Sequence, residues 1–222
     1  MLIVPQEFNR NAKTVQDQDT PTHTGRILID YMCERIGIDD LAGRDLLDHG
    51  CGVRFSESVL NLGLPVGSYT GLDVHGPLIS FLQEAVSDPR FAYHHVDVAN
   101  QMYNPEGHAK VPYAEVLPAE QRFDIASMFS VITHQDPEEA RHSFTFLRRH
   151  IRDDGHMFFS AFLHEDEVPF QQLIPSRPGL KASYARPHLT DLLRDTGWEV
   201  LSVVDPLPQD VPIMWSLLCR PV

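Results

Sequence analysis

The sequence predicts an α/β protein with one mainly parallel β-sheet of seven strands. The first observation is an apolar segment that runs through an acid and two closely spaced glycines, Asp48-His49-Gly50-Cys51-Gly52, into a segment of helical character. The second is the order strand, helix, turn, strand over residues 123–162. The third is the alternation of apolar strands with amphipathic helices along the chain, which is typical of parallel sheets.

The chain begins with a polar, irregular segment. Residues 1–23 are rich in Gln, Asn, Asp and Thr, a composition that favours a flexible N-terminal arm over a lid. From Thr24 to Gly37, apolar residues recur at helical spacing, which predicts a helix packed beside the sheet. We therefore divide the chain into an arm, residues 1–23, and a single domain, residues 24–222, without internal repeats.

The glycine turn after the first strand organises the rest of the chain. Glycine tolerates a positive φ and lets a ligand approach the backbone closely. A helix predicted from about Phe55 to Gly63 directs its N-terminal N–H groups and partial positive charge toward the same place. A turn of this kind at the carboxyl edge of a sheet predicts a shelf for a polar ligand.

The next two predicted strands also end in acids. Residues 69–74 form the second strand, and Asp73 lies about 20 residues beyond the glycine turn, where a carboxylate can bond ribose hydroxyls. A helix cap is the alternative role for Asp73, because a helix is predicted over residues 77–86. Residues 91–98 predict a third strand that ends near Asp97.

The second half of the chain contains the clearest helix start. Asp136 is followed by Pro137 and two acids, as expected for an N-cap, a first-turn proline and acids near a helix N-terminus. The predicted elements from here to the end are a fourth strand (123–130), this helix (136–151), a turn (153–155), a fifth strand (156–162), another helix (187–195) and two final strands (198–204 and 213–219).

Composition excludes several classes of partner. The net charge of −13 argues against nucleic acid, whose binding proteins carry a basic face. No apolar segment approaches the roughly 20 residues of a membrane span. Three cysteines at unrelated spacings indicate neither a disulfide framework nor a zinc site, and the neighbouring His94 and His95 point to opposite strand faces. We expect a cytoplasmic protein without a metal, a membrane or a nucleic-acid partner.

Two segments carry a resemblance to a known family. The glycine turn with its preceding Asp48 resembles the first motif of class I S-adenosylmethionine (SAM) dependent methyltransferases, and residues 123–134 resemble the fourth. The last two strands resemble the antiparallel hairpin that closes this fold. The resemblance extends from about residue 24 to the end and implies a Rossmann-like three-layer sandwich, SAM as cofactor and methyl transfer to a small molecule. It departs from the motif of enzymes that methylate exocyclic amines of bases.

The resemblance also implies a set of cofactor-binding residues. Asp73 would bond the ribose, while Asp97 and Val98 would contact the adenine, whose amino group can donate to a carboxylate. Arg54 replaces a glycine that many members have, and its side chain could reach the methionine carboxylate, pack over the turn or point to solvent. The complete set is Asp48, Gly50, Cys51, Gly52, Asp73, Val74, Asp97, Val98 and Phe129.

The reaction itself leaves alternatives open. A histidine with a near-neutral pKa would suit an oxygen acceptor, slightly preferred here over nitrogen, and His134 and His164 are the candidates. An NAD(P)-linked oxidoreductase is an alternative, although Phe55 stands where the dinucleotide fingerprint has its third glycine. A non-catalytic SAM-binding protein that acts by interaction is the other. The sequence predicts no oligomeric state.

Overall fold

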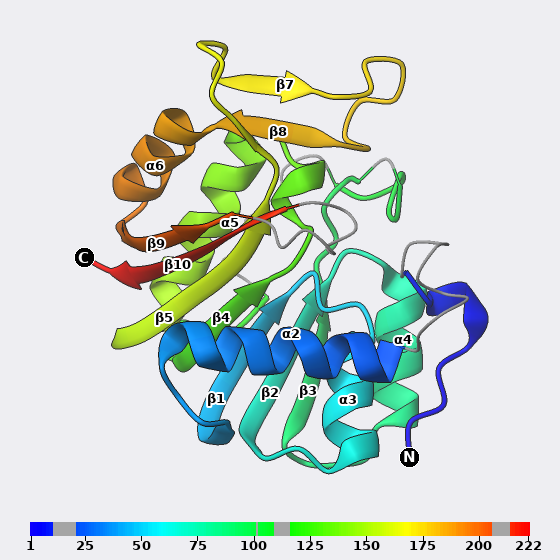
Figure 1. The fold of residues 1–222 in the computed structure, drawn as a ribbon. Coiled ribbons are helices and arrows are strands. Elements are labelled where there is room, and N and C mark those ends of the chain that lie inside the picture. Colours follow the sequence, from blue (N-terminus) through cyan, green and yellow to red (C-terminus); the bar gives the residue numbers. More distant parts are fainter. Residues whose placement is uncertain (11–20, 101, 109–115, 206–213) are drawn as a thin grey trace.

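A computed structural model describes residues 1–10, 21–100, 102–108, 116–205 and 214–222 (Figure 1). The helical elements are η1 (Gln6–Phe8), α2 (Pro21–Ile36), α3 (Arg54–Leu62), α4 (Gly76–Ala85), η3 (Ile132–His134), α5 (Pro137–His150) and α6 (Arg186–Asp195). The strands are β1 (Leu41–His49), β2 (Val66–Asp73), β3 (Phe91–His95), β4 (Phe123–Met128), β5 (Ile151–Ala161), β6 (Leu163–His164), β7 (Phe170–Gln172), β8 (Ala182–Ala185), β9 (Trp198–Val204) and β10 (Trp215–Pro221).

The main sheet has seven strands in the order β3-β2-β1-β4-β5-β10-β9. The pairs β2–β3, β1–β2, β1–β4 and β4–β5 are parallel, whereas β10 runs antiparallel to both β5 and β9. The predicted fold class, with its mainly parallel sheet and antiparallel final hairpin, is confirmed. Strand order reverses beside β1, so the glycine turn lies where open α/β sheets bind ligands.

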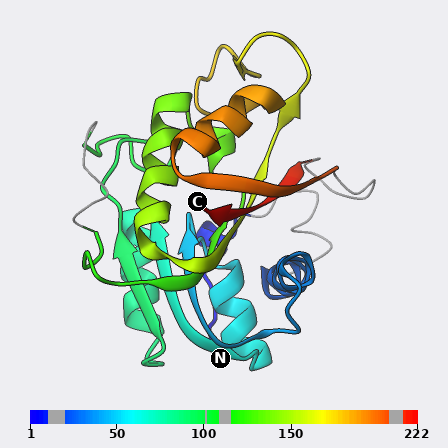
Figure 2. The ribbon, with the colours of Figure 1, turned by 90° about the vertical axis from the view of Figure 1, so that its left-hand side faces the viewer.

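Alternating side chains along each strand produce two separate cores. Successive residues of a strand point to opposite faces, and Leu46 and Leu47 of β1 accordingly belong to different hydrophobic clusters. One cluster includes residues of α2, α3 and α4, and the other includes residues of α5 and α6. The result is a sheet between two helical layers, with α5 and α6 on the side opposite α2 and α3 (Figure 2).

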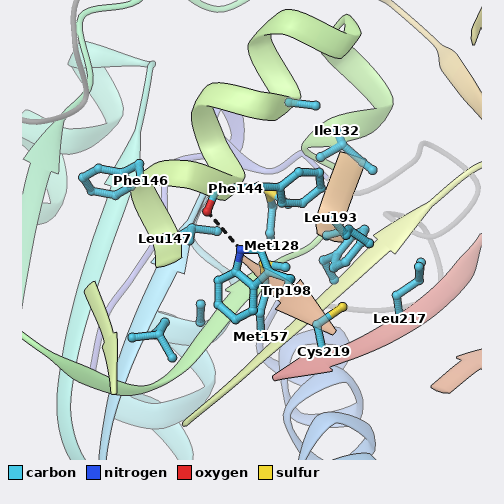
Figure 3. Packing of buried hydrophobic residues seen from close by; sticks show 14 of the residues in the cluster. Met128, Ile132, Phe144, Phe146, Leu147, Met157, Leu193, Trp198, Leu217 and Cys219 are labelled. Carbon is cyan, nitrogen blue, oxygen red and sulfur yellow. Dashed lines mark hydrogen bonds between the residues drawn. The ribbon is translucent and has the colours of Figure 1, made fainter. Parts of the chain in front are cut away.

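Trp198 is the largest fully buried side chain of the second cluster. Its indole Nε1 donates a hydrogen bond of 3.0 Å to the carbonyl oxygen of Phe144 in α5 (Figure 3). Because Trp198 begins β9, this bond ties the terminal hairpin to the helix that crosses over from β4 to β5. Residues of β9 and β10 also belong to the same hydrophobic cluster as residues of α5 and α6, so the hairpin is part of this core.

The start of α5 follows the sequence closely. Asp136 accepts hydrogen bonds from the backbone N–H groups of Glu138 and Glu139, and the Glu139 carboxylate accepts from the Asp136 N–H at 2.8 Å. This reciprocal capping box satisfies three backbone donors that the helix itself leaves free. It fixes the direction of the segment that connects β4 to α5, and His134 lies in that segment.

Two expected elements differ in the structure, and one small sheet was not expected. The predicted turn at residues 153–155 is a bulge inside β5, since Phe123 pairs with Ile151 and the next paired residues are Ile125 and His156. The third strand ends at His95, before the expected Asp97. Residues 163–185 form a small sheet in the order β6-β8-β7, which the sequence pattern did not predict because its strands are only two to four residues long.

Residues 1–10 lie against the domain. Leu2 and Phe8 are buried, and α2 begins at Pro21. The division of the chain at residue 23 stays a prediction. No helix within the described ranges combines the length and the apolar character that a membrane crossing needs.

Candidate functional site

A cavity of about 1200 Å³ lies at the carboxyl edge of the main sheet. It is lined by the glycine turn, by the residues that follow β2 and β4, and by one face of α2 that carries Thr24, Leu28 and Tyr31. We call it the carboxyl-edge cavity. Its volume exceeds the 300–1,000 Å³ of most ligand pockets.

The glycine turn forms the floor of this cavity. Gly50 and Gly52 have φ of 72° and 50°, in the left-handed region that favours glycine. A Cβ at Gly50 would also overlap the side chain of Val131. The N–H groups of Gly50 and Cys51 donate to the Leu72 carbonyl at 2.7 and 2.9 Å, so β2 holds the turn in place.

Asp48 lies beneath the turn and does not line the cavity. It is 4% exposed and accepts hydrogen bonds of 2.7 Å from Tyr69 and from Ser127. Burial raises the pKa of Asp48 to about 6 despite these two donors. The structure therefore places Asp48 as a support of the turn, and its predicted role at the cofactor stays a prediction.

Asp73 reaches into the cavity from the end of β2. Its Oδ2 accepts from the Gly52 N–H at 3.0 Å and its Oδ1 from the His75 N–H at 2.9 Å, which aims the carboxylate across the turn. Arg10 donates to both oxygens, at 3.0 and 3.1 Å. Val74 lines the cavity beside Asp73.

Asp97 and Val98 lie outside the residues that line the cavity. The Asp97 carboxylate bonds the Asn104 amide at 3.0 Å and the His108 ring at 2.7 Å, and Val98 forms a bridge with His108. Val96, the first residue after β3, lines the cavity in place of the two neighbours that the resemblance implies. The adenine contacts of Asp97 and Val98 stay a prediction.

Phe129 and Ser130 form the wall after β4. The Phe129 ring lies edge-on to Phe55 with centroids 5.5 Å apart, which fixes an apolar surface beside the turn. Ser130 has a φ of 58°, rare for a residue with a side chain, and its N–H donates to Ser160 Oγ at 2.9 Å. Backbone held in this region is often associated with function.

The two candidate histidines are in different surroundings. His134 lines the cavity, and its Nδ1 donates to the Gly179 carbonyl at 3.1 Å. Burial lowers the pKa of His134 more than the Gly179 and Leu180 carbonyls raise it, so the ring is neutral near pH 7, and with Nδ1 donating its Nε2 carries the lone pair. His164 does not line the cavity; Nε2 donates to the Val168 carbonyl at 2.8 Å and Nδ1 accepts from the Ser183 hydroxyl at 2.9 Å.

Arg54 occupies the position of the missing third glycine and also lines the cavity. Within the described residues no acceptor receives a hydrogen bond from its guanidinium, although Asp48 attracts its charge. Burial lowers the pKa of Arg54, but an arginine stays protonated at neutral pH. The cavity thus contains a cation that is available to an anionic group.

Sequence reasoning missed Arg10 as a residue of this site, whereas it offered Tyr103, in the long connection over residues 99–122, as part of a substrate wall. The Arg10 guanidinium lies 4.0 Å from the centre of the Tyr103 ring, and both residues line the cavity. Nothing in the local pattern marks Arg10, since it is in the polar N-terminal segment. Among the described residues, no group of three or more His, Cys, Asp or Glu side chains is arranged to hold a metal ion.

Solved structures share this architecture. The glycopeptide N-methyltransferase MtfA complexed with sinefungin aligns with a TM-score of 0.61 and 16% identity, over 92% of this chain and 95% of that one. The 1,6-didemethyltoxoflavin-N1-methyltransferase of Burkholderia thailandensis, with 1,6-didemethyltoxoflavin and S-adenosylhomocysteine bound, has a TM-score of 0.59 and 19% identity, over 93% and 80%. Magnesium protoporphyrin IX methyltransferase from Synechocystis PCC 6803, with S-adenosylhomocysteine bound, has a TM-score of 0.59 and 16% identity, over 90% and 83%.

At these identities the three structures establish the fold. The family follows from the sequence itself, since residues 25–203 match the methyltransferase domain over more than half of the chain. The predicted resemblance is thereby confirmed, and the chain belongs to the methyltransferase-domain family of SAM-dependent enzymes.

Proposed function

We propose that the chain transfers a methyl group from SAM to a small-molecule acceptor, with oxygen slightly preferred over nitrogen. The observation that carries the proposal is the carboxyl-edge cavity, which brings the glycine turn, Asp73, Phe129 and His134 to one place. Its size accommodates a cofactor and an acceptor together. The three similar methyltransferases are named for a glycopeptide, 1,6-didemethyltoxoflavin and magnesium protoporphyrin IX, and these compounds are consistent with a small-molecule acceptor.

The residues of the cavity fit SAM at both ends. The Asp73 carboxylate suits ribose hydroxyls, which are hydrogen-bond donors. Arg54 lies at the start of α3 as an available cation, and a guanidinium pairs well with a carboxylate such as that of the methionine part. Of the three roles considered for Arg54, we therefore assign to it the binding of the methionine carboxylate.

The chain's contribution to the reaction is positioning and proton transfer. SAM supplies the electrophilic methyl group when bound. The Phe129 surface and the α2 face exclude water and hold the acceptor in line with the methyl group. Holding both reactants in this geometry lowers the entropic part of the barrier, because the step becomes effectively unimolecular. His134 Nε2 takes the proton of an acceptor hydroxyl, a role that suits a neutral imidazole. His164 has no place in this scheme because its ring nitrogens are bonded elsewhere.

Calorimetric titration tests the cofactor assignment. We expect S-adenosylhomocysteine to bind with micromolar affinity and NAD and NADP not to bind. Asp73→Ala is expected to weaken binding at least tenfold, or about 1.4 kcal/mol. Asp153→Ala, which removes a carboxylate that is 96% exposed and distant from the cavity, is the control and leaves the affinity unchanged. Binding of NAD in place of S-adenosylhomocysteine would favour the oxidoreductase alternative.

Turnover tests the reaction. SAM labelled in its methyl group is incubated with panels of hydroxyl and amine compounds, and transfer to a hydroxyl compound is expected. Transfer to amines alone would reverse the acceptor preference. Tight binding of S-adenosylhomocysteine with no transfer to any compound would favour the non-catalytic alternative.

A further inference from the structure

The first ten residues form a strap along the edge of the domain, and two anchors hold it. The Leu2 backbone exchanges two hydrogen bonds with the Asn61 side chain in α3, at 2.6 and 2.9 Å. Phe8 is buried, with its ring centroid 5.3 Å from Phe81 of α4 and 5.7 Å from His75. Arg10 follows two residues after this second anchor, so the position of Phe8 restrains the backbone from which the Arg10 side chain reaches the cavity.

The guanidinium of Arg10 forms a bidentate ion pair with the carboxylate of Asp73. The two terminal nitrogens of the guanidinium lie 3.0 and 3.1 Å from the two carboxylate oxygens. The Asp73 side chain is 1% exposed and that of Arg10 is 22% exposed, so solvent screens the pair weakly. The face of the guanidinium rests on the Tyr103 ring at 4.0 Å, which adds a cation–π contact.

The carboxylate of Asp73 has no free acceptor position in this arrangement. An ionised carboxylate offers about four lone-pair positions. Two are taken by the N–H groups of Gly52 and His75, and two by Arg10. The backbone donors are fixed by the turn, whereas the Arg10 side chain has rotatable bonds. Any further donor must therefore take the place of Arg10.

We propose that Arg10 is an autoinhibitory latch, which closes the ribose position at Asp73 until the hydroxyls of a nucleoside ligand displace it. The inference rests on the proposed function, since it takes SAM and S-adenosylhomocysteine as the ligands. The strap keeps its anchors at Leu2 and Phe8, and only the Arg10 side chain leaves the carboxylate. Apparent affinity is then the intrinsic affinity multiplied by the fraction of molecules in which Asp73 is open.

The test is titration of Arg10→Ala with S-adenosylhomocysteine beside the wild-type protein. Removal of the latch is expected to tighten binding about tenfold, and this factor measures the open fraction directly. Arg10→Lys keeps the charge but cannot bridge both oxygens, so an intermediate affinity is expected. Arg220→Ala is the matched control; it removes a half-exposed arginine that pairs with Glu199 at 2.6 Å outside the cavity, and the affinity should not change.

A second background makes the test specific to the pair. In Asp73→Ala the carboxylate that Arg10 covers is gone, so Arg10→Ala is expected to add no gain in affinity there. A gain of equal size in both backgrounds would overturn the latch, because it would show a general effect of charge. Weaker or unchanged binding of Arg10→Ala in the wild-type background would also overturn it, since Arg10 would then support the ligand or be indifferent to it. If neither protein binds S-adenosylhomocysteine, the proposed function fails, and the latch fails with it.

Discussion

The hydroxyl of Tyr69 in β2 donates a hydrogen bond of 2.7 Å to the buried carboxylate of Asp48 in β1, directly beneath the glycine turn. Ser127 of β4 donates to the other oxygen of the same carboxylate at 2.7 Å. Three adjacent strands thus meet at one acid. The two hydrogen bonds explain why an acid can be buried there. They offset only part of the free-energy cost of burying its charge, so the stability of the fold should depend on pH.

Asp48→Asn is expected to remove part of this pH dependence. The folded-state pKa of Asp48, about 6, is above the value of 3.8 usual for an aspartate, so the folded protein binds this proton more tightly than the unfolded chain. The stabilisation is complete below about pH 4 and is lost as the pH rises through about 6, with a total of about 3 kcal/mol. Asparagine does not ionise, so the Asp48→Asn variant does not lose this stabilisation as the pH rises.

Urea unfolding at pH 5 and pH 7.5 measures the effect. The free energy of unfolding of Asp48→Asn should rise relative to wild type on going to pH 7.5. Asp153→Asn, at an exposed position, controls for the loss of one negative charge. An equal difference between Asp48→Asn and wild type at both pH values would contradict the prediction.

Gly25→Ala is expected to displace α2 from the cavity. A Cβ at Gly25 would overlap the Arg54 carbonyl and Ser58 Oγ in α3, and Ser58 Oγ donates to the Thr22 carbonyl at 2.5 Å. Overpacking of this kind costs about 1–3 kcal/mol. Urea unfolding should show that loss, and titration should show weaker binding of S-adenosylhomocysteine because α2 forms one wall of the cavity.

The control for Gly25 is another glycine-to-alanine change. A Cβ at Gly76, the first residue of α4, would lie 3.4 Å from the His95 ring, an ordinary contact. Gly76→Ala should therefore unfold at the urea concentration of the wild type or slightly above. Equal stability of the two variants would mean that the packing of α2 on α3 is looser than the structure indicates.

His134→Ala is expected to reduce the rate of methyl transfer to a hydroxyl acceptor by about 10²- to 10⁴-fold, the usual value of a general base. Because burial lowers the pKa of His134 below 6.5, the wild-type kcat should stay level above that pH and fall only in more acidic solution. A pH profile of kcat for the acceptor found in the labelling screen measures both effects. Binding of S-adenosylhomocysteine should be unchanged.

His164→Ala is the paired control for the second predicted histidine. Its ring bonds Ser183 and the Val168 carbonyl and lies outside the cavity lining, so a change there should leave the pH profile of kcat intact. If the pH profile of kcat changed with His164→Ala and not with His134→Ala, His164 rather than His134 would be the general base.

Trp198→Phe is expected to destabilise the domain without changing the affinity for S-adenosylhomocysteine. The substitution removes the hydrogen bond to the Phe144 carbonyl and leaves a small void in a buried cluster (Figure 3). The sum of the two losses is about 1–3 kcal/mol. Urea unfolding measures the loss and titration the affinity; a change in affinity would mean that the terminal hairpin shapes the cavity from a distance.

The sequence by itself determined the elements whose signals are local. The glycine turn, the helix that follows it and the capped start of α5 were predicted at the right places, because φ preference, caps and apolar spacing act within a few residues. The strand β9 was predicted with its observed bounds, residues 198–204. The fold class follows from these elements together, whereas the family follows from the resemblance of the glycine turn and residues 123–134 to its motifs, which the match over residues 25–203 confirms.

Only the tertiary structure decided which side chains meet in the cavity. Arg10 reaches Asp73 across 63 residues, and His134 faces the cavity while His164 is bonded within the small sheet. Asp97 bonds Asn104 and His108 and does not line the cavity. Contacts between distant segments depend on strand register and on side-chain packing, and no pattern within a few residues of the sequence indicates either. The sequence therefore determined the scaffold, and long-range packing determined the contact between Arg10 and Asp73 and which of the two histidines lines the cavity.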